Sequence, residues 1–260
     1  AAPTPGLLGF KAVSVGMGDT VVVPEGYTVR TLGAWGTPIL GDMPAFRPGA
    51  NTGAEQAMQT GMHHDGMHFF PIDGSSDDGL LVVNHEYIEP RFLHAEAYKG
   101  QALDSDEVVY DGETRPDDHV LKEMNAHGVS VYRITKGADG AFAPVADAHN
   151  RRITALTEID IAGPAKGSKL LVTKYAPNGD KTRGTINNCA YGVTPWNTYM
   201  AAEENWAGYF TSHDAENGEP KLPRELKRYG VVAGKNGRYG WEKAAGGADE
   251  YIRFDASTKG

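Results

Sequence analysis

Cysteine is nearly absent from this sequence: Cys189 is the only one among 260 residues. A single cysteine excludes a disulfide bond within the chain, so the cross-links of small exported proteins do not stabilise this fold. A lone thiol is either a small apolar residue of the core or a reactive group that binds metal or acts as a nucleophile. Composition alone favours the core residue, and the surrounding sequence has to decide between the two.

Long apolar segments and an excess of basic residues are also missing. The sequence has no run of about 18 apolar residues, so we expect no membrane-spanning helix. It contains 25 basic and 34 acidic residues, which gives a net charge of −9. Nucleic-acid binding needs clustered Lys and Arg, so nucleic acid is not an expected partner. An acidic surface suits a soluble protein with cation sites built from oxygen atoms.

The common catalytic motifs do not occur either. The sequence lacks a G-x-x-x-x-G-K-[ST] loop, an H-E-x-x-H helix, a G-x-S-x-G turn and a C-x-x-C pair. These absences disfavour P-loop nucleotide enzymes, zinc proteases of the zincin type, α/β-hydrolases and zinc ribbons. Any catalytic site must therefore be built from residues scattered along the chain.

Glycine is abundant, with 33 residues, and the 15 prolines divide the chain further into short segments. Such spacing is typical of short strands joined by turns. Three β-hairpins are predicted: 67–72 with 80–87, 128–135 with 141–145, and 188–193 with 198–204. A short helix is expected from Pro116 to about Ala126, because proline and acidic residues begin it. Further strands are expected at 21–23, 27–32, 155–161, 169–175, 229–233 and 251–254, with a long loop over 33–62.

The hairpins recur at intervals of roughly 40–60 residues, which resembles the spacing of propeller blades, although β-sandwiches produce it too. We predict an all-β fold, a β-propeller with loop excursions and a short helix. At this spacing the chain holds about three to four blades, fewer than most closed propellers contain. The predicted domain therefore covers residues 1–260 and continues beyond Gly260, because the final residues resemble the interior of a loop.

The first residues, AAPTPG, lack a methionine and are small, like the residues that flank the cleavage site of an export signal. We therefore expect an exported protein, periplasmic or extracellular. An arbitrary start at this point would give the same residues, so this expectation rests on composition as well.

Polar residues gather at the open ends of the predicted hairpins. Centring the first hairpin on its turn places Asp65 opposite Glu86, and the third brings Cys189 close to Glu203, with Glu204 at the strand end. Oxygen ligands suit Ca²⁺, whereas a thiolate suits a transition metal, so a mixed site is predicted. Because side chains alternate along a strand, one of the two adjacent glutamates should bind metal and the other brace the strand. Solvated acidic residues at strand ends remain the alternative.

The segment 184–206 carries the most specific pattern. It reads Gly-Thr-Ile-Asn-Asn-Cys-Ala-Tyr-Gly at 184–192, Thr-Pro-Trp at 194–196 and Glu-Glu-Asn-Trp at 203–206. Supporting motifs are Val-Pro-Glu-Gly-Tyr at 23–27, His-His-Asp-Gly-Met at 63–67, Asn-His-Glu-Tyr at 84–87 and Met-Asn-Ala-His-Gly-Val-Ser-Val at 124–131. In this order, and over nearly the whole chain, these motifs resemble the PhoX-type alkaline phosphatases.

The resemblance implies an exported bacterial phosphatase that scavenges phosphate and acts on phosphomonoesters. It implies a six-bladed β-propeller with the active site on its axis. It also implies export by the twin-arginine route, which suits a protein that folds around metals before translocation. The implied cofactors are iron (Fe³⁺) and calcium, and the implied catalytic group is a metal-bridging oxo or hydroxo group rather than a side chain.

The motifs also imply roles for individual residues. Cys189 corresponds to the thiolate that bridges the irons, Glu204 to a metal ligand with Glu203 as a further candidate, and Glu86 to a calcium ligand. Second-rank candidates for lining the site are Asp65, Asn125, His127 and Asn188.

Members of this family are considerably longer than the chain, which resembles their N-terminal half. The resemblance places the later acidic ligands and a phosphate-binding arginine in the other half, so the C-terminal remainder of the same protein is an expected partner. Two other functions remain open: a propeller that calcium stabilises and that has no catalytic activity, and a propeller hydrolase acting on a lactone or a phosphodiester.

Overall fold

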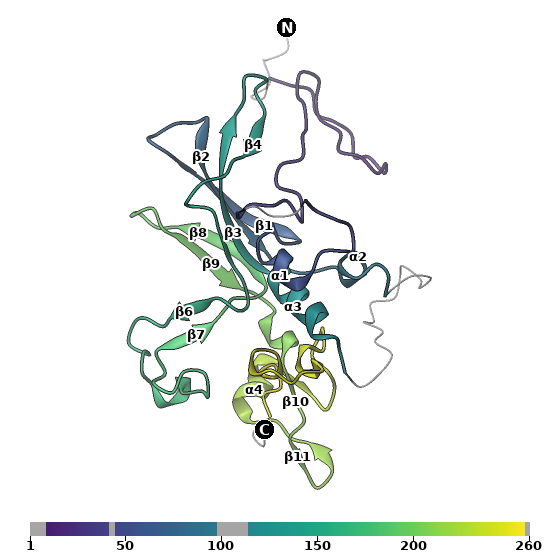
Figure 1. Cartoon of the computed structure of the whole chain (residues 1–260), viewed down its shortest axis with the longest axis vertical. Helices are drawn as coiled ribbons and strands as arrows, with labels where there is room; N and C mark the ends of the chain where they lie inside the picture. Colours follow the sequence, from purple (N-terminus) through teal and green to yellow (C-terminus); the bar gives the residue numbers. More distant parts are fainter. Residues whose placement is uncertain (1–8, 42–44, 98–113, 258–260) are drawn as a thin grey trace, which may run out of the picture.

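The computed structural model describes residues 9–41, 45–97 and 114–257. In these ranges the chain forms mostly short strands with a few short helices, and the described strands form no closed barrel (Figure 1). The largest sheet has the order β1-β2-β3-β4, and β5 also pairs with β3. The prediction of a strand-rich fold with a short helix is confirmed, and the number of blades stays a prediction.

The strands of the large sheet pair in antiparallel fashion. They are β1 (His64–Pro71), β2 (Asp78–His85), β3 (Gly128–Lys136), β4 (Phe142–Pro144) and β5 (Arg151–Ile153). Four two-stranded sheets follow: β6 (Glu158–Asp160) with β7 (Lys181–Arg183), β8 (Asn188–Val193) with β9 (Tyr199–Glu203), β10 (Thr211–Ser212) with β13 (Val232–Ala233), and β11 (Ala215–Glu216) with β12 (Glu219–Pro220).

The helices are all short. They are α1 (Gly53–Gln56), α2 (Pro90–Leu93), α3 (Asp117–Ala126), α4 (Arg224–Tyr229) and α5 (Asp249–Ile252), with 3₁₀ turns η1 (Lys169–Leu171), η2 (Trp206–Tyr209) and η3 (Trp241–Lys243). No helix in the described ranges is long and apolar enough to cross a membrane.

All three predicted hairpins are present, but two of their strands contain a β-bulge. In the first, Met67 pairs with Val83, one residue away from the predicted pairing, and the register shifts between His64 and Met67. In the third, the register shifts between Asn188 and Tyr191. Bulges bend a strand and re-aim a side chain, and they are frequent beside functional sites. The predicted direct pairing of Asp65 with Glu86 is therefore corrected: Asp65 lies within the first bulge.

Four predicted strands are absent or displaced. Residues 21–23 and 27–32 form no strand, since no neighbouring strand in the described ranges pairs with them. Residues 169–175 begin with η1. The Ser168 side chain accepts a hydrogen bond from the Leu170 backbone amide, and this N-cap favours a helical start. Residues 251–254 lie at the end of α5, whose first turn carries two acidic residues that suit a helix N-terminus.

Two other predictions hold only in part. Within 155–161 only β6 is extended, because Thr157 donates a backbone hydrogen bond to Thr154 and closes a turn before it. Within 229–233, α4 extends to Tyr229 and ends at Gly230, whose φ of 83° is left-handed, so only β13 is a strand. The short helix predicted from Pro116 is confirmed as α3.

The main core lies between α3 and the C-terminal segment rather than between two sheets. Its largest fully buried side chains include Leu93, Met124, Tyr209, Trp241 and Phe254. Smaller apolar clusters cover the two faces of the large sheet. Because α3 runs directly into β3, this packing fixes the end of the sheet from which the site residues extend.

A buried ion-pair network holds α3 to that core. The Glu123 carboxylate accepts hydrogen bonds from Arg115 at 2.5 and 2.9 Å, from His94 at 2.9 Å and from the Trp241 indole at 2.7 Å. Burial alone raises the pKa of Glu123, but the Arg115 charge and the hydrogen bonds from His94 and Arg115 lower it to about 2. A buried carboxylate with this many partners stabilises one arrangement of the core.

A second buried cation, Arg152, joins α3 to the sheet. Its guanidinium donates to the Ser130 hydroxyl at 3.0 Å and to the carbonyls of Asn125 at 2.7 Å and His127 at 2.8 Å. Ser130 in turn lies 2.6 Å from Nε2 of His85, the last residue of β2. Burial lowers the pKa of Arg152 to about 9. These contacts fix the end of β2, which Glu86 follows directly.

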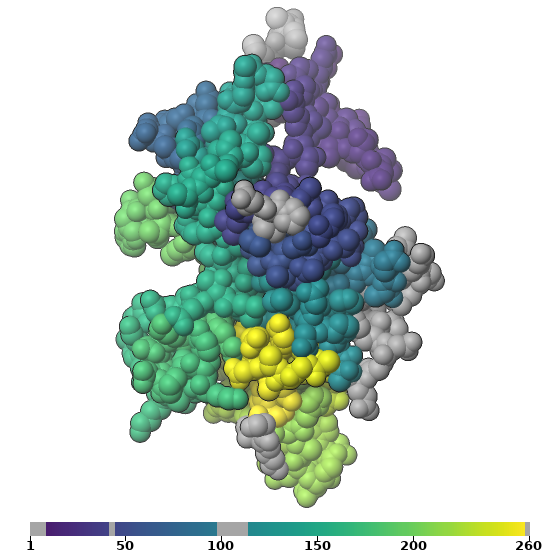
Figure 2. Space-filling view, viewed as in Figure 1, coloured from purple at the N-terminus to yellow at the C-terminus, as the bar shows by residue number. Residues whose placement is uncertain are grey.

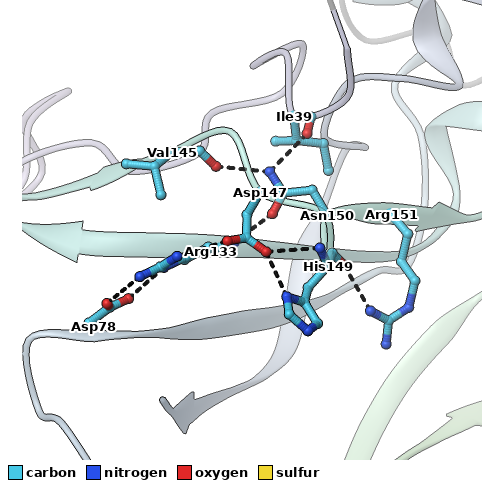
Figure 3. Close-up of polar contacts among 8 residues, drawn as sticks. All are labelled: Ile39, Asp78, Arg133, Val145, Asp147, His149, Asn150 and Arg151. Atoms are coloured by element: carbon cyan, nitrogen blue, oxygen red, sulfur yellow. Dashed lines mark hydrogen bonds and ion pairs between the residues drawn. The ribbon is translucent and has the colours of Figure 1, made fainter. Parts of the chain in front are cut away.

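The other end of β3 is held by a partly buried polar network (Figure 3). Arg133 donates to Asp78 on β2 and, at 2.8 Å, to Asp147 in the loop after β4. Asn150 completes the loop by donating to the carbonyls of Ile39 and Val145. These bonds order the loop and the segment around Ile39 without contacting the hairpin ends where the polar motifs lie.

On the face shown in Figure 2, residues of the β6–β7 region lie beside the yellow C-terminal residues, and Arg183 pairs with Asp249 across them at 2.7 Å. Both segments line an open pocket of about 860 Å³. Neither Glu86 nor Cys189 lines it, so size alone does not identify the functional site.

We predict that Glu123→Gln lowers the free energy of unfolding by about 3–5 kcal/mol, because it removes the carboxylate that compensates the buried Arg115 charge. The pKa of Glu123 is below its ordinary value of 4.5, so its stabilisation is complete above that pH and is lost as the pH falls toward about 2. Urea unfolding near neutral pH and in acid measures both effects. Glu219→Gln, an exposed change, should alter neither. A Glu123→Gln variant with wild-type stability and acid dependence would contradict this role.

Candidate metal centre

Three side chains from distant parts of the sequence converge at the bulged hairpin ends. One ligand atom from each of Asp65, Glu86 and Cys189 lies within 4.8 Å of the others. Cys189 Sγ lies 3.7 Å from Asp65 Oδ2. Asp65 belongs to the β1 bulge, Glu86 follows β2 and Cys189 belongs to the β8 bulge, so two irregular strands and one strand end aim their side chains at one point.

Asn84 attaches the β8–β9 hairpin to the large sheet. Its buried side-chain amide donates to the carbonyl of Cys189 at 2.8 Å and to that of Ala190 at 3.3 Å. The Tyr199 hydroxyl lies 2.9 Å from the Gly66 carbonyl and 3.0 Å from Asn84 Oδ1. The β8–β9 hairpin (light green in Figure 1) therefore lies against β1 and β2 although it belongs to a separate sheet.

Gly66 permits this close approach. A Cβ at this position would lie 2.7 Å from the Cys189 carbonyl oxygen and 2.8 Å from the Tyr191 ring. Neither distance is compatible with a methyl group, so only glycine fits between the two bulges without moving them.

Asn187 connects Glu86, just after the end of β2, to Glu204, the second residue of the Glu-Glu-Asn-Trp motif. Its φ of 52° is left-handed, a conformation that asparagine tolerates better than most residues. Its side-chain amide donates to the Glu86 carbonyl at 3.3 Å, and its own carbonyl accepts from the Glu204 amide at 2.9 Å. One residue therefore sets the position of Glu86 relative to Glu204.

Glu204 lies beside the three converging side chains and acts on the thiol of Cys189. Its carboxylate raises the pKa of the Cys189 thiol and accepts a hydrogen bond from Asn205 Nδ2 at 3.0 Å. Asn205 Nδ2 lies 3.1 Å from the Tyr87 hydroxyl as well. The carboxylates of Asp65 and Glu86 together with Glu204 thus surround the thiol.

Glu203 points elsewhere. Its Oε1 accepts hydrogen bonds from the Ile186 amide at 2.9 Å and the Thr185 hydroxyl at 3.0 Å. This is the bracing role that the sequence predicted for one of the two adjacent glutamates. The structure does not bring Glu203 together with Cys189, and its role as a ligand stays a prediction.

Three second-rank candidates are engaged away from the cluster. Asn125 donates to the Gly53 carbonyl at 2.9 Å, and Asn188 donates to the Thr185 hydroxyl at 2.8 Å. His127 is fully buried between the Glu123 carbonyl and the Tyr209 hydroxyl, and this burial lowers its pKa to about 4. Since α3 ends in the core, these contacts hold Asn125 and His127 within the fold, and the predicted place of Asn125, His127 and Asn188 in the site stays a prediction.

The cluster is electrostatically unfavourable without a cation. Burial, together with the neighbouring Asp65 and Glu204 carboxylates, raises the pKa of Glu86. The hydrogen bond to Glu204, burial and the charges of Asp65 and Glu86 raise the pKa of the Cys189 thiol to about 12. A bound metal ion reverses this effect, because it stabilises thiolate and carboxylate together. The donor set, one sulfur with several carboxylate oxygens, fits a site that holds a transition metal beside a hard cation.

Several contributors to the site carry little signal in the sequence. Asn84 and Asn187 belong to the quoted motifs, but their roles depend on contacts more than 100 residues apart in sequence. Arg238 lies in a weakly patterned segment, and its guanidinium carbon is 4.8 Å from the centre of the Tyr87 ring. No local pattern distinguishes it from other exposed arginines.

We predict that Gly66→Ala lowers the free energy of unfolding by about 1–3 kcal/mol and weakens the binding of a cation at the cluster, because the added methyl separates β1 from β8. Thermal unfolding and calcium titration measure the two effects. Gly192→Ala, on the β8–β9 hairpin that Gly66 faces, is the matched control, since its Cβ would meet only the Met200 methyl at 3.7 Å. Equal stability and calcium affinity in both variants and the wild type would show that the close approach is not required.

Comparison with known proteins supports these observations. A search of curated proteins finds no match to the chain. Among solved structures, Pseudomonas fluorescens PhoX in complex with vanadate, a transition state analogue, is similar, with a TM-score of 0.77 and 30% sequence identity. The similarity covers 94% of this chain but 40% of that chain, so the present chain spans less than half of that relative. The family model described as alkaline phosphatase PhoX matches residues 8–260, and the chain therefore belongs to the PhoX alkaline phosphatase family.

Proposed function

We propose that the protein containing this chain is an alkaline phosphatase that hydrolyses phosphomonoesters and releases inorganic phosphate. The observation that carries the proposal is the convergence of Asp65, Glu86 and Cys189 within 4.8 Å, in a chain of the PhoX family. The similar structure holds vanadate, described as a transition state analogue, which supports a phosphate-like ligand.

The proposed metals are iron and calcium, and the donor chemistry supports this choice. Calcium binds oxygen ligands and has little affinity for sulfur, whereas iron accepts thiolate. We assign Cys189 to iron, and Glu86, Glu204 and Asp65 to the cations around it. When bound, such cations neutralise charge on the phosphoryl oxygens and supply an activated oxygen nucleophile. The side chains themselves hold and orient the cations, and none is assigned to proton transfer.

The proposal extends to the rest of the protein. A six-bladed propeller closed by the C-terminal remainder would cover the exposed β8–β9 hairpin, on which Trp196 and Met200 are 73% and 57% exposed. Apolar side chains in such positions are usually covered by another part of a protein. Export, by the twin-arginine route, to the periplasm or the exterior belongs to the same proposal, as does a role in phosphate scavenging.

The direct test is phosphomonoesterase activity at alkaline pH in the purified full-length protein. We expect activity that a chelator removes and that Cys189→Ala lowers by at least about 100-fold, with loss of iron, because the thiolate is the ligand that selects a transition metal. Glu219→Gln, an exposed change on the β11–β12 hairpin, is the control and should retain activity and metal.

Other outcomes identify the alternatives. Bound calcium without iron and without turnover would indicate a propeller that calcium only stabilises. Turnover of a lactone or a phosphodiester but of no phosphomonoester would assign the protein to another class of hydrolase. A Cys189→Ala variant with normal metal content and full activity would overturn the assignment of the centre.

A further inference from the structure

Arg238 lies beside the metal centre in a fixed position. Its guanidinium carbon is 4.8 Å from the centre of the Tyr87 ring and 6.0 Å from that of the Tyr209 ring. Its backbone amide donates to the Gly208 carbonyl at 2.8 Å. Stacking of a guanidinium on aromatic rings holds its plane while its N–H groups stay exposed at the edge.

The rings that hold Arg238 are themselves attached to the centre. Tyr87 follows Glu86 in the chain, and its hydroxyl accepts a hydrogen bond from Asn205, which also donates to Glu204. The Tyr209 hydroxyl lies 3.5 Å from the Glu86 carbonyl. Glu86 and Glu204 are therefore both linked to the two tyrosine rings that hold Arg238. The position of the guanidinium depends on the positions of these two glutamates.

The donors of Arg238 are not used within the described ranges. The other arginines close to the core or the sheet all donate to carboxylates or carbonyls; they are Arg115, Arg133, Arg151, Arg152, Arg183 and Arg253. In the part of the chain that the structure describes, no group accepts a hydrogen bond from the Arg238 side chain, which is exposed. A guanidinium that is held in place by stacking and has free donors is pre-organised for a ligand from solution.

The electrostatic surroundings indicate an anion. Arg238 stacks on Tyr87, the residue that directly follows Glu86 in the chain. The cation is therefore near the cluster, yet it forms no ion pair with it. Guanidinium groups bind phosphoryl oxygens in a bidentate manner, and a bound phosphoryl group would lie between metal ions on one side and this arginine on the other.

We propose that Arg238 is a substrate-binding residue, whose guanidinium donates hydrogen bonds to two non-bridging oxygens of the phosphoryl group held at the centre of Asp65, Glu86, Cys189 and Glu204. This inference rests on the proposed function, since it names a phosphomonoester as the ligand of the same site. It assigns to Arg238 a contribution to phosphate affinity and not to metal binding.

The experiment uses the full-length protein with its metals and the variants Arg238→Met and Arg238→Lys. Arg238→Met keeps an apolar chain against Tyr87 and removes the donors. Arg228→Met, at an exposed position of α4, is the matched control. The measurements are metal content, steady-state kinetics with p-nitrophenyl phosphate, and calorimetric titration with inorganic phosphate.

We expect Arg238→Met to raise KM and to weaken phosphate binding about 10- to 100-fold, the usual loss for charge-assisted hydrogen bonds, with metal content unchanged. Arg238→Lys should recover only part of the affinity, because an ammonium cannot bind two oxygens in the same way. Arg228→Met should behave as the wild type.

Wild-type phosphate affinity in Arg238→Met, full recovery in Arg238→Lys, or loss of metal in Arg238→Met would each overturn the inference. If the wild type hydrolyses phosphomonoesters and Arg238→Met does so equally well, the inference fails and the proposed function stands. If the wild type binds phosphate through Arg238 without turnover, the proposed function fails and the binding role stands. A wild type that neither binds phosphate nor hydrolyses phosphomonoesters would overturn both.

Discussion

The hydrogen bond from the Asn84 side chain to the Cys189 carbonyl is the contact on which the candidate site depends. It crosses 105 residues of sequence and joins two sheets that share no backbone ladder. It is also partly buried, so its loss would leave polar groups without water to replace it. Gly66 makes the contact possible, because it leaves room for the β8 backbone beside β1. Without this junction the thiol and the carboxylates would remain on separate hairpins.

Stability and function place opposite demands on this junction. Asp65, Glu86 and Glu204 crowd carboxylates around one thiol, which raises the pKa values of Glu86 and Cys189. Such crowding opposes folding unless a cation binds, and cation binding then adds to the stability of the folded state. The buried polar contacts of Glu123 and Arg152 offset this electrostatic repulsion, because they fix α3, β3 and the end of β2 next to the cluster.

Local sequence predicts the hairpins and α3 well, because turn residues and apolar alternation are local signals. It also selects Cys189 and Glu86 through a specific motif. It does not predict the bulges at Asp65 and Cys189, since a single inserted residue leaves no periodic signal and moves the register by one. The strands expected at 169–175 and 251–254 do not form, because capping starts η1 at Lys169 and acidic first-turn residues start α5 at Asp249. The position of Arg238 depends on tertiary contacts alone.

The central claim is that the Cys189 sulfur binds a transition metal within this carboxylate cluster. X-ray absorption at the iron edge of the intact, metal-loaded protein tests it most directly, because it detects the atoms bound to iron without requiring turnover. The account predicts a sulfur atom in the first coordination shell of iron, and its replacement by oxygen in Cys189→Ser. A first shell of oxygen and nitrogen alone in the wild type, or a sulfur that persists in Cys189→Ser, would contradict it.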